Sequence, residues 1–219
     1  ISYQNSDGDD PTAGARTVRV TINDGDGGIS ANTDMTVTVA AVNDVPTTGN
    51  LDGDSFTFTE NDAATAIDQS SNATVADVDS SDFNGGSLTV TITSGEDAAE
   101  DILSFLTSGT VALAGTTAGS NVSVGGSVVG TLGNAIAAGN DLVVNFNSTN
   151  ATVANVQTLV RAISYQNSDG DNPTAGARTV RVTISDGDGG TSSNADMTVT
   201  VAAVNDAPTI TSNDGAATA

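Results

Sequence analysis

Apolar and polar residues alternate over many short stretches of this chain, in the period-two pattern that predicts half-buried β-strands. The stretches that alternate, or run apolar over strand length, are residues 55–60, 72–77, 87–93, 102–107, 141–147, 177–184 and 196–204. Residues 121–132 (NVSVGGSVVGTL) contain Gly125-Gly126 between two such halves. Because glycine adopts the positive φ of a tight turn, this segment predicts an extra hairpin.

One segment has the helical period instead. Residues 152–163 (TVANVQTLVRAI) repeat apolar side chains every three or four positions, which predicts one short helix. The remaining strand signals are separated by short turns rich in Gly, Asn and Asp. This arrangement favours an all-β, immunoglobulin-like β-sandwich over a fold of alternating strands and helices.

A long segment of the chain occurs twice. Residues 1–47 align without gaps with residues 163–209 and differ at six of the 47 positions. The six pairs are Asp10/Asn172, Asn23/Ser185, Ile29/Thr191, Ala31/Ser193, Thr33/Ala195 and Val45/Ala207. Such fidelity indicates β-sandwich repeats in tandem.

The duplication suggests a division of the chain. We expect residues 48–209 to form a complete repeat and residues 1–47 to supply the C-terminal strands of a preceding one. Residues 210–219 do not repeat residues 48–57, and we expect them to begin the first strand of a following domain. An alternative is an assembly in which neighbouring chains complete each other's sandwiches by strand addition.

The composition narrows the possible chemistry. The chain has 27 acidic and 5 basic residues, a formal net charge of −22, and no His, Cys or Trp. Without His and Cys there is no imidazole or thiol catalyst and no ordinary zinc, copper or haem site, so we expect no enzyme. Nucleic-acid phosphates would be repelled, and no apolar run of about 18 residues is present to enter a membrane. Hard divalent cations suit so many carboxylates, although acidity alone also keeps a protein in solution.

Carboxylate and amide side chains gather in a few short stretches. The candidate ligands are Asp7, Asp9 and Asp10 in NSDGDDP, Asn43 and Asp44 in VNDVP, Glu60 in FTEN, Asp77, Asp79 and Asp82 in ADVDSSDFNGG, Asp186 and Asp188 in SDGDGG, and Asn205 and Asp206 in VNDAP. In an immunoglobulin-like sandwich, the loop after the second strand and the last hairpin turn lie at one pole, where the chain enters the domain. We therefore expect the Asp7 stretch and the first linker, which carries Asn43 and Asp44, to approach Glu60, Asp77, Asp79 and Asp186.

Such a group of like charges is costly unless a cation lies inside it. Calcium accepts six to eight oxygen ligands in irregular geometry, whereas magnesium requires an octahedron and retains its waters. Each candidate also has a plain structural interpretation, as a turn former or a strand end before proline. The acidic residues expected to be solvated surface charges are Asp52, Asp54, Asp62, Asp97 and Asp101.

The order of these stretches carries a family resemblance. FTEN, ADVDSSDFNGG, the Asp186 turn and VNDAP follow the order of the calcium motifs of cadherin repeats. The chain looks most like the bacterial cadherin-like tandem repeats of large surface adhesins of the repeats-in-toxin type. It departs from animal cadherins in lacking the Leu-Asp-Arg-Glu motif and in having a shorter linker.

The resemblance implies an extracellular location on a bacterial surface, calcium as the bound ion, and adjacent repeats of the same polypeptide as partners. Other copies in a filament or biofilm are further possible partners. We therefore predict a structural segment of an adhesin or surface filament, stiffened by calcium where repeats meet. The alternative is a carbohydrate-binding cadherin-like module, which needs an exposed aromatic strip. Alternation instead places Tyr3, Tyr165 and the five phenylalanines mostly in the core.

Overall fold

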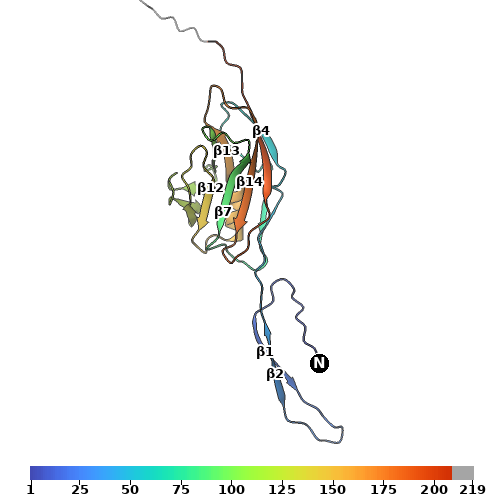
Figure 1. Cartoon of the computed structure of the whole chain (residues 1–219). Coiled ribbons are helices and arrows are strands. Elements are labelled where there is room, and N and C mark those ends of the chain that lie inside the picture. The colour runs from blue at the N-terminus through green and yellow to red at the C-terminus, as the bar shows by residue number, and fades with distance from the viewer. Residues whose placement is uncertain (209–219) are drawn as a thin grey trace, which may run out of the picture.

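A computed structural model of the chain describes residues 1–208. The strand predicted within residues 210–219 lies outside the described residues. The described chain has two parts, a two-stranded hairpin and a larger β-domain that begins at Thr47 (Figure 1). The hairpin consists of β1 (Gly14–Val20) and β2 (Thr33–Val39), which pair antiparallel.

The β-domain is built on one large mixed sheet of eight strands. In spatial order these are β4 (Ser55–Thr59), β15 (Ala195–Ala202), β14 (Gly176–Ser185), β7 (Ser87–Ser94), β12 (Leu142–Phe146), β11 (Ser127–Leu132), β10 (Asn121–Val124) and β9 (Val111–Leu113). Neighbours are antiparallel except β4 and β15, which are parallel.

Two small sheets and one helix complete the β-domain. The first small sheet contains β5 (Thr65–Ala66), β13 (Ile163–Asn167) and β8 (Asp101–Phe105), and the second contains β3 (Thr47–Gly49) and β6 (Thr74–Ala76). Helix α1 (Val153–Ala162) begins after Thr152, whose side chain accepts a hydrogen bond from the Asn155 N–H. This cap satisfies one of the free N–H groups at the start of the helix.

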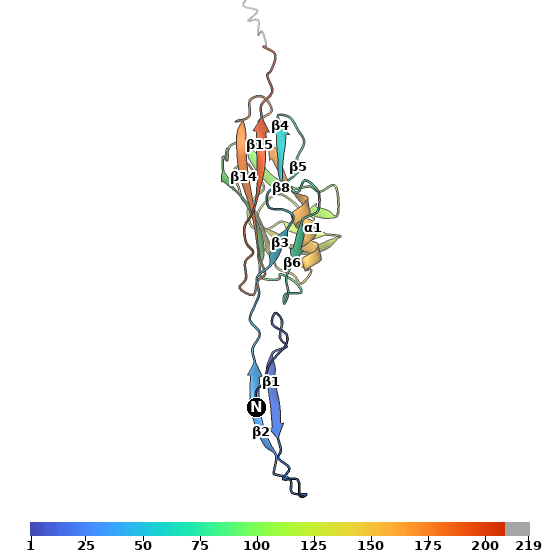
Figure 2. The ribbon, with the colours of Figure 1, turned by 90° about the vertical axis from the view of Figure 1, so that its right-hand side faces the viewer.

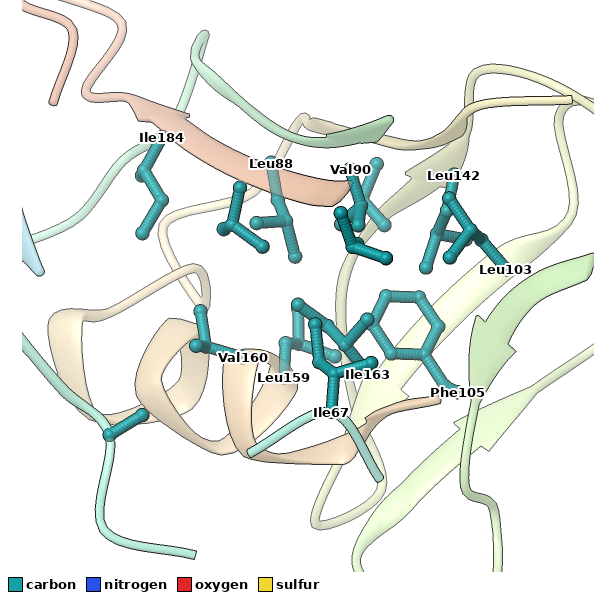
Figure 3. Close-up of a cluster of buried hydrophobic side chains, with 14 of the residues drawn as sticks. Ile67, Leu88, Val90, Leu103, Phe105, Leu142, Leu159, Val160, Ile163 and Ile184 are labelled. Carbon is teal, nitrogen blue, oxygen red and sulfur yellow. The ribbon is translucent and has the colours of Figure 1, made fainter. Parts of the chain in front are cut away.

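The core lies between the large sheet and these smaller elements (Figure 3). The residues that face each other are Leu88, Val90, Leu142 and Ile184 from the large sheet, and Ile67, Leu103, Phe105, Leu159, Val160 and Ile163 from the other layer. All are at most 4% exposed. The period-two alternation of the strands therefore points one side chain in two into this interior.

Much of the predicted secondary structure is confirmed. Each predicted strand overlaps an observed one, the hairpin of β10 and β11 turns at Gly125 and Gly126 with φ of 58° and 83°, and α1 is the single helix of residues 1–208. Strands β3, β5, β9 and β13 were not predicted. No helix within the described part is long and apolar enough to cross a membrane.

The chain enters and leaves the β-domain at opposite ends (Figures 1 and 2). Residues 40–46 arrive at the end that carries the turn between β14 and β15, which we name the N-terminal pole. Residues 203–208 leave from the other end, which we name the C-terminal pole. The hairpin extends away from the N-terminal pole, and its two strands run roughly along the long axis of the molecule.

Candidate metal centre

The first linker is hydrogen-bonded to the N-terminal pole. The Asn43 Nδ2 group donates to Asp186 Oδ2 at 2.9 Å and to the Asp44 carbonyl at 2.8 Å. The Asp44 N–H donates to Asp79 Oδ2 at 3.1 Å. Together with Asp77, these four residues form what we call the N-terminal cluster. The sequence-based expectation that the VND linker meets the loop after the second strand and the last hairpin turn agrees with this geometry.

Asp186 organises the turn between β14 and β15. Its carboxylate is fully buried, and Oδ1 accepts the N–H groups of Asp188, Gly189 and Gly190 at 2.8, 3.0 and 2.9 Å. Burial pushes the pKa of Asp186 upward, but the hydrogen bonds from Asn43 and from the turn outweigh it. The pKa therefore lies below its ordinary value, and Asp186 carries a negative charge.

A glycine allows the linker to approach this turn. A Cβ on Gly190 would lie 2.9 Å from both Asn43 Nδ2 and the Asp44 carbonyl, and it would collide with the Asp186 carboxylate. Only the bare Cα of glycine leaves room for the linker. Gly190 was not among the predicted site residues, although the two adjacent glycines at the end of DGDGG are consistent with a close backbone approach.

Asp77 and Asp79 lie on the loop after β6. Asp77 Oδ1 accepts the N–H groups of Asp79 and Ser80 at 3.2 and 2.9 Å. Asp77 Oδ2 and Asp79 Oδ1, in contrast, are buried and have no hydrogen-bond partner in the described chain. A buried carboxylate oxygen without a partner carries an uncompensated desolvation cost.

The protonation behaviour of Asp77 reflects that cost. Burial raises its pKa, the Ser80 N–H partly opposes the rise, and the neighbouring Asp79 raises it further. Two acidic side chains side by side, each with one unpartnered buried oxygen, favour a positive charge between or beside them. Asp77 and Asp79 therefore have the character of cation ligands.

Glu60 does not join the N-terminal cluster, and the expectation that it would is wrong. The Glu60 N–H donates to the Ala202 carbonyl at 2.9 Å, and Oε2 accepts the Val204 N–H at 2.8 Å. Because β4 runs parallel to β15, Glu60 lies at the C-terminal pole. At about 3.3 Å per residue, β15 separates it from the Asp186 turn by roughly 25 Å. Its Oε1 is buried without a partner, as in Asp77 and Asp79.

The second linker repeats the local geometry of the first. Asn205 Nδ2 donates to the Asp206 carbonyl at 3.1 Å, as Asn43 does to Asp44, and all four residues are exposed. Within residues 1–208, the contact with a turn like that of Asp186 is made by the first linker alone. The VND conformation is thus local, and its contact with a pole is additional.

The remaining candidates lie outside the N-terminal cluster. Asp7 Oδ1 accepts the N–H groups of Asp9 and Asp10 at 3.3 and 3.1 Å, and this exposed loop rises toward the N-terminal pole (Figure 2). Within residues 1–208 no hydrogen bond joins it to that pole. Asp82 is half-buried and its Oδ1 accepts the Asn84 N–H at 3.2 Å, whereas Asp188 is exposed.

The donor set is one of hard oxygens. No group of three or more acidic side chains within residues 1–208 is arranged to hold a metal ion by itself. The N-terminal cluster instead offers two unpartnered carboxylate oxygens, the Asp186 carboxylate, the Asp44 carbonyl and an amide. Rotating the Asn43 amide by half a turn would present its oxygen in place of Nδ2. Mixed oxygen ligands completed by water are compatible with calcium.

One buried polar network was not predicted from the sequence. Asp101 was expected on the surface, but it is 1% exposed and accepts Arg178 Nε at 2.8 Å and the Tyr165 hydroxyl. Burial and the Asp101 carboxylate raise the pKa of Tyr165. The signal was present in the alternation, because Asp101 is in phase with the core residues Leu103 and Phe105.

Comparison with models of known protein families finds no match to this chain, and comparison with curated proteins finds no similar sequence. The cadherin-like resemblance therefore stays an interpretation of the motifs.

Proposed function

We propose that this chain is a structural segment of an extracellular bacterial adhesin or surface filament, built from immunoglobulin-like, cadherin-like β-sandwich repeats in tandem. Calcium bound where the linker meets the β-domain stiffens the joint. One observation carries the proposal. The Asn43–Asp44 linker is hydrogen-bonded to the pole where Asp77 and Asp79 each leave a buried carboxylate oxygen without a partner.

The residues of the N-terminal cluster fit calcium. Asp77, Asp79 and Asp186 would supply carboxylate oxygens from the β-domain, and Asn43 and Asp44 would supply oxygens from the linker. Calcium tolerates such an irregular set, whereas magnesium requires a near-ideal octahedron. Bound calcium supplies the positive charge that the Asp77–Asp79 pair lacks.

Shared ligands explain how the joint becomes stiff. Two direct hydrogen bonds link residues 43 and 44 to the side chains of the pole, and rotation of the linker can break them one at a time. Ligands drawn from both sides of the joint hold the linker and the pole in one geometry. The loop before β1, which carries Asp7 and Asp9, rises toward the same pole (Figure 2), and these residues would add oxygens from the hairpin side.

The C-terminal pole resembles one half of the next joint. Glu60 keeps one buried oxygen without a partner, and Asn205 and Asp206 repeat the linker geometry beside it. A following repeat that carried residues like Asp77, Asp79 and Asp186 would complete the set. On this basis the candidate ligands divide between two joints, one before and one after the β-domain.

The test is thermal melting and small-angle X-ray scattering of the full chain in calcium, in magnesium and in EDTA. Calcium at ten times its Kd should stabilise the chain by about 1.4 kcal/mol, and extracellular modules bind with a Kd of about 10⁻⁴–10⁻³ M. We expect calcium to narrow the distribution of angles between hairpin and β-domain, and magnesium to do so less.

The matched variants are Asp77→Asn with Asp79→Asn, and Asp24→Asn as control. Asp24 accepts the same kind of turn N–H bonds in the hairpin, from Asp26 and Gly28, but no linker residue of the described chain is hydrogen-bonded to it. The double variant should lose the calcium response and the control should keep it. An unchanged calcium response in the double variant would contradict the proposal.

The carbohydrate-binding alternative is less well supported. It needs a strip of exposed aromatic rings, but Phe58, Phe83, Phe105, Phe146 and Tyr165 are at most 4% exposed. Within residues 1–208 the one strongly exposed ring is Tyr3, at 43%. Tyr3 was expected in the core, but it lines an open groove on the hairpin.

A further inference from the structure

The hairpin exposes an apolar face that is buried in the second copy of the same sequence. Tyr3, Val18, Met35 and Val37 line an open groove of about 330 Å³, and Tyr3 and Met35 are each 43% exposed. The equivalent residues of the β-domain are Tyr165, Val180, Met197 and Val199, each at most 1% exposed. We name the first set the hairpin face.

The two edges of the hairpin are also open. In the β-domain, β14 pairs with β7 on its outer side, and β15 pairs with β4. Within the described chain, β1 and β2 pair only with each other. Free strand edges beside an exposed apolar face form a surface that can pair with another polypeptide segment.

The hairpin face also carries an incompletely paired charge. Arg178 donates to the buried Asp101 carboxylate, and Arg16 is its equivalent in the hairpin. Within residues 1–208, Arg16 has only carbonyl partners, from Thr12 at 2.6 Å and Ala15 at 3.4 Å. A segment that covers the hairpin face is therefore expected to bring a carboxylate at the position of Asp101.

The six sequence differences hardly alter the covered surface. In the β-domain, the variant positions Asn172, Thr191, Ser193 and Ala207 are exposed and Ser185 is partly exposed. Only Ala195 is buried, at 1% exposure, and its counterpart Thr33 is slightly larger. The hairpin thus presents nearly the same side chains that residues 163–202 present to residues 48–162.

We propose that the hairpin face is an interaction surface for a second copy of the segment 48–162. In that copy, residues 163–202 must not already be packed against the segment. That segment brings the β7 edge, the β4 edge and the Asp101 carboxylate. A folded second molecule of this chain is a poor partner, because its segment 48–162 is occupied. Displacing that molecule's own strands would uncover as much surface as it covered. The proposal does not depend on calcium.

The experiment adds the missing segment to the full chain. In one arm, a second copy of residues 48–162 is fused directly before Ile1, which recreates the Ala162–Ile163 junction, since Ile-Ser-Tyr follows in both places. In the other arm, residues 48–162 are mixed with the full chain as a separate polypeptide. Amide hydrogen exchange is measured by mass spectrometry, and differences such as Asn23/Ser185 and Thr33/Ala195 distinguish peptides of the two copies.

In the chain alone, we expect residues 14–39 to exchange at least about 100-fold faster than residues 176–202. In either arm, residues 14–39 should slow to within about tenfold of residues 176–202. Unchanged exchange of residues 14–39 in both arms overturns the proposal.

Variants of the fused chain separate specific docking from unspecific collapse. Met35→Asp places a charge on the hairpin face and should abolish the protection of residues 14–39. Asp101→Ala in the added segment should reduce that protection at least about tenfold, because Arg16 loses its carboxylate. The control is Arg19→Ala, whose exposed pair with Asp34 faces away from the groove, and it should leave protection unchanged. Protection that survives Met35→Asp would contradict the proposed surface.

Discussion

The two copies of one sequence, residues 1–40 and residues 163–202, share the pairing of their last two strands but not their burial. Gly14 pairs with Val39 in the hairpin as Gly176 pairs with Val201 in the β-domain, and the registers stay in step to the end. Register is therefore set within the segment itself. Burial is not, because the same apolar residues are covered only where residues 48–162 pack against them.

The arginines of the two copies extend this comparison to charge. Arg178 forms a buried ion pair with Asp101, whereas Arg16 is partly exposed and bonded to carbonyl groups. In contrast, one bidentate ion pair is the same in both copies: it joins Arg19 to Asp34 in the hairpin and Arg181 to Asp196 in the β-domain. Contacts made within the segment are reproduced, and contacts that reach outside it are not.

The largest expected difference between the copies concerns the arginines. Arg178→Ala leaves Asp101 charged and buried without its partner, and should destabilise the β-domain by about 3–5 kcal/mol. Arg16→Ala should change the same unfolding free energy by less than about 0.5 kcal/mol. Urea denaturation of both variants measures the difference. Equal effects would mean that the buried ion pair of Arg178 with Asp101 does not stabilise the β-domain.

The methionines should show the next largest difference. Met197→Ala removes a buried side chain and should cost about 2–5 kcal/mol, because it leaves a cavity in the core. Met35→Ala, at a 43% exposed position, should cost less than about 0.5 kcal/mol. Thermal melting of the two variants at matched concentration tests this. A large loss from Met35→Ala would show that the hairpin face is already covered in solution.

The turn glycines test the contact with the linker. Gly190→Ala places a methyl group against the Asp44 carbonyl and should cost about 1–3 kcal/mol through overpacking. Gly28→Ala, in the equivalent turn of the hairpin, meets only the exposed Asp24 side chain and should cost about 0.5 kcal/mol or less. Chemical denaturation gives the values, and scattering should show a looser joint in Gly190→Ala alone.

The smallest effect is a pH dependence. The pKa of Asp186 is depressed, so its stabilising contribution is present above the ordinary value of 3.8 and is lost as pH falls through the folded-state pKa. Asp186→Asn should therefore lower the free energy of unfolding by about 1 kcal/mol near pH 6, and the variant and the parent should become equally stable in strong acid. Asp24→Asn should change the melting of the β-domain less, since Asp24 is exposed. Thermal melting of the parent and both variants at several pH values between about pH 2 and 6 measures these differences. A difference between Asp186→Asn and the parent that does not shrink in acid would contradict the prediction.

The sequence predicted the period-two strands, the Gly125-Gly126 hairpin and the short helix well, because these depend on local patterns. Strand β13 was missed because it follows α1 directly and continues its apolar pattern, so that no turn residue separates the two. Strands β5 and β9 have only two or three residues and are defined by their neighbours. Such short strands leave no period of their own in the sequence.

The candidate site was predicted in part. Asn43, Asp44, Asp79 and Asp186 were expected together and are joined by hydrogen bonds. Glu60 was assigned to the wrong pole because the sequence does not reveal that β4 pairs parallel with β15 and so ends beside the second linker. Asp101 was misassigned because its charge was given more weight than its phase with Leu103 and Phe105.

The parallel pairing of β4 with β15 has a mechanical consequence. Because the linkers leave from opposite poles, a pulling force applied through them drags β4 and β15 past each other along their length. The backbone hydrogen bonds between the two strands are then loaded in shear, so that all of them carry the force at the same time and do not open one after another. The β-domain is therefore expected to resist stretching between its two poles.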